Sequence, residues 1–278
     1  MMDSEGQPAV DTTVPSPARI YDYALGGAQN FAVDRAVLDQ ITEIFPSTPQ
    51  PARDNRDFLR RAVRFCGERG IGRFLDLGSG IPTVDNVHEV AQKRDPAARV
   101  VYVDNDPVAA AHAYRLLGGV HGATMLQQDM RDTEQILAQP EVRSLLDDQE
   151  PVAVLMVAMA HYLKDADDPI KILSAYREAM PPGSYLVFSH MTGDDFPEQL
   201  AQAVETFNAD ASDNDQMVLR SHAEQQELLE ASGFALVDPG LTYPACWRPQ
   251  TTLNVDHDPR NATFYAAVAH PRRHNPAV

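Results

Sequence analysis

Two short stretches of this 278-residue chain constrain its fold most, because each has the pattern of a buried strand that ends at a binding site. Arg73–Gly80 has the sequence RFLDLGSG, and Arg99–Asp106 has the sequence RVVYVDND. Both are apolar, partly β-branched runs that end in acidic or glycine residues, as strands of a parallel sheet often do. Since ligands of open parallel sheets bind outside the carboxyl ends of the strands, the two stretches predict a nucleotide-type site as well as a fold.

Short β-rich runs alternate with helical stretches from Arg73 onward, which predicts βαβ units and a doubly wound α/β fold. We expect strands at 73–77, 99–103, 123–127, 152–158, 185–189, 235–238 and 263–268. We expect helices at 84–94, 107–117, 133–138, 169–180, 197–209 and 221–232. Pro107 and Pro169 fit the first turns of their helices, where a missing N–H costs nothing.

The N-terminal quarter lacks this alternation and predicts three regions for the chain. Residues 1–18 are polar and rich in proline, so we expect them to be disordered or loosely ordered. Residues 19–72 should form a helical extension or lid packed on the main domain, which spans 73–278. Within the extension we expect a bend at Gly26-Gly27, a helix from 33, a proline-rich break at Pro46, Pro49 and Pro51, and a helix at 54–68.

Composition excludes several classes of protein. The chain has 23 basic and 40 acidic residues, a formal net charge of −17, which disfavours nucleic acids and acidic membrane surfaces as partners. Cys66 and Cys246 have no CxxC or Cys/His spacing, so neither disulfides nor a metal site is expected. The longest apolar run, 152–160, is about half of the roughly 20 residues of a membrane span, and the N-terminus lacks signal-peptide features. These features predict a soluble, cytoplasmic protein, with its oligomeric state left open.

The predicted strand ends carry the chemistry. Gly78 and Gly80 allow a sharp turn and a close approach of the backbone to a polar ligand. Thr83 stands where the third glycine of a GxGxxG loop would be, which disfavours NAD or FAD, and no GxxxxGK[ST] loop is present. Asp104 is placed to accept both hydroxyls of a ribose, and Asp129 to accept an exocyclic adenine amine. Taken alone, each acid is more often simply a turn residue at a strand end, but together they indicate an adenosine-containing ligand without a pyrophosphate.

Several longer strings extend this pattern to a family. LDLGSG, VYVDND and QQDMRD resemble the first three motifs of the seven-stranded methyltransferases that use S-adenosylmethionine. The chain from 19 to about 269 more closely resembles the bacterial S-adenosyl methyltransferase family, formerly listed as a domain of unknown function, in the strings RIYDYALGGAQNFAVDR, ARDNRDFLRRAVRF, FLDLGSGIPTVDNVHEVAQ, VVYVDNDPVAAAHA, PVAVLMVAMAHYL, DADDP, PGSYLVFSH and RSHAE. The resemblance implies a Rossmann-like, mostly parallel sheet of seven strands whose last strand is antiparallel, with S-adenosylmethionine as cofactor.

The resemblance also implies roles for single residues. It puts Asp76, Gly78, Ser79 and Gly80 around the methionyl part of the cofactor, Asp104 on the ribose, Asn105 beside the adenine, and Asp129 with Met130 at the adenine edge. Tyr21 and the Gly26-Gly27 bend are suited to fold over the cofactor as a lid. Arg53 and Arg56 are alternative partners for the methionyl carboxylate, although arginines on a helix of so acidic a protein also form surface ion pairs.

Histidines at two strand ends indicate an acceptor that must lose a proton. His161 follows the fourth predicted strand and His190 closes the fifth, and an imidazole with an ordinary pKa takes up a proton near neutral pH. Either could instead cap its strand. The Asn-Pro-Pro-Tyr string of many amino-group methyltransferases is missing, so we expect methyl transfer to an oxygen of a small molecule. Tyr162, Tyr243 and Trp247 are candidates to line the acceptor pocket, although Trp247 would equally pack against the core.

Two other functions remain open at this point. The same pocket would serve a non-catalytic protein that binds S-adenosylmethionine or S-adenosylhomocysteine and has a regulatory or partner-binding role. A nicotinamide-dependent oxidoreductase is the other alternative, and Thr83 disfavours it. Transfer of labelled methyl groups would distinguish an enzyme from the non-catalytic binder. A thermal shift with NAD but none with S-adenosylmethionine would indicate the oxidoreductase.

Overall fold

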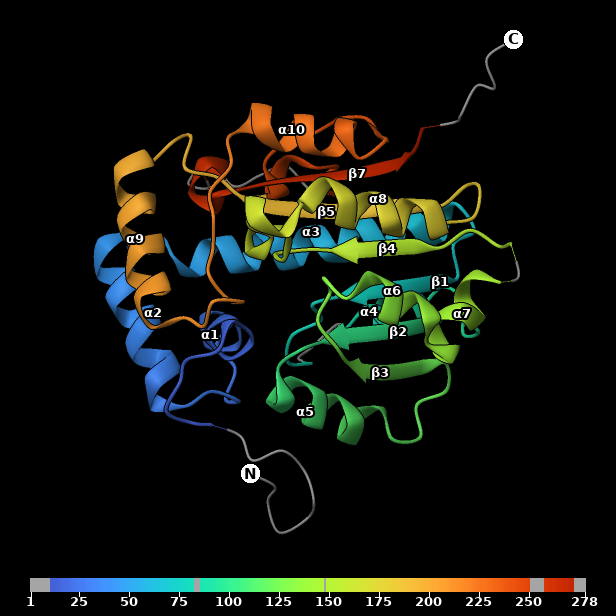
Figure 1. Cartoon of the computed structure of the whole chain (residues 1–278), viewed down its shortest axis with the longest axis horizontal. Coiled ribbons are helices and arrows are strands. Elements are labelled where there is room, and N and C mark those ends of the chain that lie inside the picture. Colours follow the sequence, from blue (N-terminus) through green and yellow to red (C-terminus); the bar gives the residue numbers. More distant parts are fainter. Residues whose placement is uncertain (1–10, 83–85, 148, 251–257, 273–278) are drawn as a thin grey trace.

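The computed structural model describes residues 11–82, 86–147, 149–250 and 258–272 (Figure 1). Its centre is a seven-stranded sheet with the order β3-β2-β1-β4-β5-β7-β6. The strands are β1 (Arg73–Leu77), β2 (Arg99–Asp104), β3 (Ala123–Gln127), β4 (Ala153–Met156), β5 (Tyr185–Met191), β6 (Phe234–Leu236) and β7 (Phe264–Pro271). β7 runs antiparallel to β5 and β6, whereas the pairs from β3 to β5 are parallel. The predicted fold class is therefore confirmed.

Helices cover both faces of the sheet, which buries the apolar strands on two sides. One face packs against α3 (Pro49–Glu68), α4 (Val87–Gln92) and α5 (Pro107–Leu117). The other packs against α6 (Thr133–Ala138), α7 (Pro140–Leu146), α8 (Pro169–Ala179) and α10 (His222–Ala231). Short 3-10 turns lie at Ala160–Tyr162, Asp165–Asp167, Pro244–Cys246 and Pro259–Ala262.

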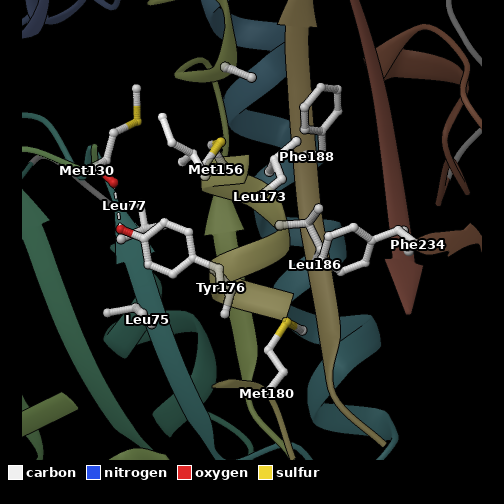
Figure 2. Packing of buried hydrophobic residues seen from close by; sticks show 14 of the residues in the cluster. Leu75, Leu77, Met130, Met156, Leu173, Tyr176, Met180, Leu186, Phe188 and Phe234 are labelled. Atoms are coloured by element: carbon white, nitrogen blue, oxygen red, sulfur yellow. Dashed lines mark hydrogen bonds between the residues drawn. The ribbon is translucent and has the colours of Figure 1, made fainter. Parts of the chain in front are cut away.

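The core on the α8 face also fixes a loop of the site. Figure 2 shows Tyr176 of α8 between Leu75 and Leu77 on one side and Leu186 on the other. Tyr176 is 1% exposed, and its hydroxyl donates a hydrogen bond of 2.7 Å to the carbonyl oxygen of Met130. A buried hydroxyl needs such a partner, so core packing fixes the turn that follows β3.

A third group of helices covers the edge where the parallel strands end. It comprises α1 (Pro17–Ala24), α2 (Ala32–Ile44) and α9 (Pro197–Asp210), seen at the left of Figure 1 beyond the tips of β2, β3 and β4. An apolar cluster that includes Ile20, Leu38 and Phe207 joins them. Helices from the two ends of the chain thus form one cover over the edge where the sequence places its site residues.

The elements differ from the predictions at a few boundaries. α3 begins at Pro49 and not after the proline-rich break, because Pro49 and Pro51 fall in its first turn, where proline is accommodated. Helix α1 begins at Pro17, before the expected start of order, and α7 was not predicted. β4 ends at Met156, two residues early, because Ala158 has a left-handed φ of 57°. Thr83 and the expected helix start at 84 lie outside the described residues.

Candidate functional site

A cavity of about 300 Å³ opens at the carboxyl ends of the strands. It lies at the point where the strand order reverses, between β1 and β4, which is where open α/β sheets bind ligands. Its walls are the turns after β1, β2, β3 and β4, together with the segment from Asp11 to Arg19 and the loop residues Asn214 and Asp215. We call it the main cavity.

The turn after β1 depends on two glycines with left-handed backbone. Gly78 has a φ of 74° and Gly80 a φ of 65°. A Cβ on Gly78 would overlap the side chain of Met159, which would have to move to admit a larger residue. A Cβ on Gly80 would meet nothing within 4 Å, so at Gly80 the backbone conformation alone favours glycine.

Asp104 joins two neighbouring turns of the site. Its Oδ2 accepts a hydrogen bond of 2.7 Å from the N–H of Gly80, and its Oδ1 accepts one of 2.9 Å from the N–H of Asp106. Burial raises the pKa of Asp104 to about 6, although both N–H groups favour the charged form. Each oxygen keeps a second lone pair, so the carboxylate still has room for hydroxyl donors from a ligand.

Asp76 is the second buried acid of the main cavity. It is 7% exposed in β1, and burial is the main reason that its pKa is raised to about 7. The guanidinium of Arg56 lowers this pKa and the nearby Asp104 raises it further. Two buried carboxylates side by side favour a ligand with positive charge.

The structure modifies the expectation for Asp129. Its two oxygens accept hydrogen bonds from Arg131, with 2.8 Å from Nε to Oδ1 and 2.6 Å from Nη2 to Oδ2. Arg131 itself lines the main cavity and was not predicted. The carboxylate is thus oriented by a bidentate arginine, and only its remaining lone pairs face other donors.

Two side-chain oxygen atoms of the main cavity are buried without a hydrogen-bond partner among the described residues. They are Oγ of Ser79 and Oε1 of Gln128. Ser79 was predicted, whereas Gln128 was missed although it stands next to Asp129. Because buried polar groups are normally paired, these two atoms indicate that a polar ligand completes the site.

Of the two arginines expected to bind the cofactor, only one lies at the main cavity, and Tyr21 of the expected lid lies there as well. Arg56 lines the main cavity, and its Nη2 lies 3.4 Å from Oδ1 of Asn86, whereas Arg53 is exposed and outside the lining. Tyr21 of α1 lines the cavity, and its hydroxyl donates to the carbonyl oxygen of Ala52 at 3.1 Å. Asn105 and Met130 also line it, as expected.

A second cavity of about 120 Å³ adjoins the first. The two share lining residues, including Tyr21, Ala158 and Tyr162. We call the second one the apolar cavity, because its lining comes mainly from apolar side chains of α1, α2 and α9. A polar and an apolar cavity that share part of their lining could hold two ligands side by side.

His161 belongs to the apolar cavity. Its ring is 2% exposed, and its Nδ1 has no hydrogen-bond partner within the described residues. Burial lowers the pKa of His161 well below its ordinary value, and the neighbouring His190 and Arg220 lower it further. The ring is therefore neutral at pH 7 and presents an acceptor nitrogen.

His190 does not reach either cavity, contrary to expectation. It is fully buried, its Nδ1 lies 2.7 Å from the carbonyl oxygen of Met191, and its Nε2 lies 2.9 Å from Nη1 of Arg220. Burial is the main reason that its pKa falls to about 3. Because both of its ring nitrogens are occupied, His190 has a structural role, as the strand-capping alternative predicts, and does not act as a base.

Two predicted acceptor residues also lie elsewhere. The hydroxyl of Tyr243 is hydrogen bonded to Asp195 at 2.8 Å, and the residue lines neither cavity. Trp247 is fully buried against the rings of Phe58 and Phe65, so it packs in the core beneath α3. Their place on a loop gave no signal of which face they would join.

Residues that sequence reasoning missed come from segments far apart in the chain. Ser16 closes the main cavity from the N-terminal side and hydrogen bonds to Asp106, the residue that caps α5. Asn214 and Asp215 reach it from the loop after α9. Only Asp106 carried a signal, as an acid immediately before a proline at a helix start.

Neither a metal site nor a membrane-spanning helix is found in the part of the chain described. No group of three or more histidine, cysteine or acidic residues there is arranged to hold a metal ion. Among the helices of the same part, none combines the length and apolarity of a membrane span.

Comparison with known proteins identifies the family. A family model described as S-adenosyl methyltransferase matches residues 3–272. A solved structure from Thermobifida fusca YX, provisionally named a methyltransferase, is 37% identical with a TM-score of 0.88 and covers 96% of this chain and 98% of its own. A DUF574 family protein from Streptomyces avermitilis MA-4680 is also 37% identical, with a TM-score of 0.87, and covers 95% of this chain and 100% of its own. No curated protein matches significantly. The chain therefore belongs to the S-adenosyl methyltransferase family, whose cofactor is S-adenosylmethionine.

Proposed function

We propose that the protein transfers a methyl group from S-adenosylmethionine to a hydroxyl oxygen of a small molecule bound in the apolar cavity. The observation that carries this proposal is the buried, neutral His161 in a cavity that adjoins the main cavity and shares Tyr21, Ala158 and Tyr162 with it. The net charge of −17 argues against nucleic acid as the acceptor.

The residues of the main cavity fit the cofactor. The carboxylates of Asp76 and Asp104 suit the positively charged methionyl end and the ribose hydroxyls, respectively. Arg56 suits the methionyl carboxylate, and the unpartnered oxygens of Ser79 and Gln128 supply further polar contacts. Asn105, Asp129 and Met130 would border the adenine.

When bound, S-adenosylmethionine supplies an electrophilic methyl group, so that an oxygen–carbon bond forms while the carbon–sulfur bond breaks and leaves its electron pair on sulfur. The task of the protein is to align the acceptor and to receive its proton. His161 is the residue that we assign to the proton, because it lines the apolar cavity and its Nδ1 has no hydrogen-bond partner among the described residues. Tyr162, next to it, borders both cavities and would hold the acceptor.

Substitution of His161 tests this assignment. His161→Ala should lower the rate of methyl transfer by about 10²-fold or more, as loss of a general base does, while S-adenosylhomocysteine affinity by calorimetry changes little. His121→Ala, at an exposed position outside both cavities, is the control. Equal loss of rate and affinity in His161→Ala would make the histidine structural.

The cofactor site and the activity are tested separately. Asp104→Ala should weaken S-adenosylhomocysteine binding strongly, and absence of binding in the intact protein would refute the proposal. If labelled methyl groups are never transferred to a broad panel of metabolites although the affinity is intact, the protein is instead a non-catalytic binder.

A further inference from the structure

The apolar cavity carries enough detail to name a class of acceptor, an inference that rests on the proposed function. We propose that the acceptor is an uncharged aromatic hydroxyl compound, a phenol, whose ring fills the cavity between α1, α2 and α9 and whose hydroxyl faces His161.

The charge of the lining excludes ionised acceptors. Among the described residues that form the apolar cavity there is no aspartate, glutamate, lysine or arginine. The main cavity next to it is lined by several such residues, among them Asp76, Asp104 and Arg131. An acceptor with a carboxylate, phosphate or ammonium group would lose its hydration without finding a counter-charge, which is strongly unfavourable.

The shape and chemistry of the lining favour an aromatic ring. Five aromatic side chains face the cavity from separate elements: Tyr21, Phe45, Tyr162, Phe207 and Phe264. Aromatic rings pack best against other rings in offset or edge contacts, which adds to the gain from burial alone. At about 120 Å³ the space is small, so the acceptor is compact.

The histidine favours a phenol over an aliphatic alcohol. Nδ1 of His161 is the buried polar atom of the cavity that lacks a partner within the described part, so it is the natural acceptor for a hydroxyl hydrogen. Burial and Arg220 make this imidazole a weak base. A weak base removes a proton readily only from an acidic hydroxyl, which phenols have and aliphatic alcohols lack. The proton passes to the imidazole as the phenol oxygen bonds to the methyl carbon.

Matched ligands test the class. In the presence of saturating S-adenosylhomocysteine, calorimetry should detect binding of 2-naphthol and at least about tenfold weaker binding of 2-naphthoate, which keeps the ring but is charged. Decahydro-2-naphthol, the saturated alcohol, should bind but receive no labelled methyl group from S-adenosylmethionine, whereas 2-naphthol should receive one.

Matched variants test the location. Ala203 of α9 is 4% exposed and lines the apolar cavity, whereas Ala201, two residues earlier, is exposed. Ala203→Phe should weaken 2-naphthol binding about tenfold or more by filling the space, and Ala201→Phe should leave it unchanged. Ala24→Leu, from the α1 wall, is a second and smaller filling variant in case Ala203→Phe does not fold. S-adenosylhomocysteine affinity should be kept in all three.

The outcomes separate this inference from the proposed function. If S-adenosylhomocysteine binds but 2-naphthol does not, or 2-naphthoate binds equally well, the phenol class is wrong and the methyltransferase proposal stands. Unchanged 2-naphthol binding in both filling variants would place the acceptor elsewhere. Methylation of the saturated alcohol would overturn the role given to hydroxyl acidity. Failure of S-adenosylhomocysteine to bind at all would refute both.

Discussion

At the scale of single residues, the main cavity contains charges that are unfavourable for the protein by itself. Asp76 has a pKa of about 7 against an ordinary value of 3.8, chiefly because it is buried. Above pH 7 the folded protein therefore holds an ionised, desolvated carboxylate, whose cost Arg56 offsets only in part and a cationic ligand would reduce further. An ionised Asp76 therefore lowers the stability of the cofactor-free protein, which supports the proposal that it serves binding.

Replacing this carboxylate separates its effect on stability from its effect on ligand binding. Asp76→Asn should raise the stability of the cofactor-free protein at pH 8 by up to a few kcal/mol, and the gain should shrink as the pH falls from 7 toward 3.8, because the wild-type carboxyl then takes up its proton. The same variant should bind S-adenosylhomocysteine more weakly. Urea unfolding across pH and calorimetry measure both, with the exposed Glu43→Gln as control. A variant that is less stable at pH 8 would contradict the argument.

At the scale of elements, the N-terminal segment closes the main cavity through a small polar network. Asp34 of α2 accepts a hydrogen bond of 3.0 Å from the N–H of Ser16 and forms a buried ion pair of 2.9 Å with Arg19. The hydroxyl of Ser16 reaches Asp106 at the start of α5. The segment before α1 is thereby joined both to the cover and to the sheet domain.

This arrangement predicts that the segment controls cofactor release. Ser16→Ala removes a hydrogen bond to a carboxylate, and bonds of this kind contribute about 1.5–3 kcal/mol, so S-adenosylhomocysteine should dissociate about tenfold faster. Thr13→Ala removes an exposed hydroxyl of the same segment, bonded to Asp11, and should leave the rate unchanged. Stopped-flow displacement measures both variants. Equal rates in the two would show that the segment does not restrain the ligand.

At the scale of the whole molecule, the sequence predicted the parts whose pattern is local. The strand-end residues Asp76, Gly78, Asp104 and Met130 lie at one cavity because parallel strands bring their carboxyl ends together, whatever the loops between them do. Arg131 and Asp215 have no such pattern, since they reach the cavity from a turn and from a distant loop. Trp247 and His190 were misplaced because a residue type does not reveal which side of a sheet or loop it faces.

The buried His190 makes the stability of the whole fold sensitive to acid. His190 is a residue of β5, and its ring contacts Arg220 from the loop before α10; its pKa is about 3 against an ordinary value of 6.5. Its folded pKa is depressed, so the unfolded chain binds a proton that the folded protein refuses, and stability is lost as the pH falls from 6.5 toward 3. Protonation would also place a cation against the guanidinium of Arg220.

His190→Gln should therefore have a lower free energy of unfolding than the wild type at pH 8, where the lost packing of the ring dominates. This difference in free energy should shrink by about 1.4 kcal/mol for each pH unit below 6.5. The difference between the two proteins isolates this histidine from the other titrating groups. His121→Gln, at an exposed position, should follow the wild type across the range. Urea unfolding at pH 8, 6, 5 and 4 measures the slope. A constant gap between His190→Gln and the wild type would show that the buried ring is not what makes the fold sensitive to acid.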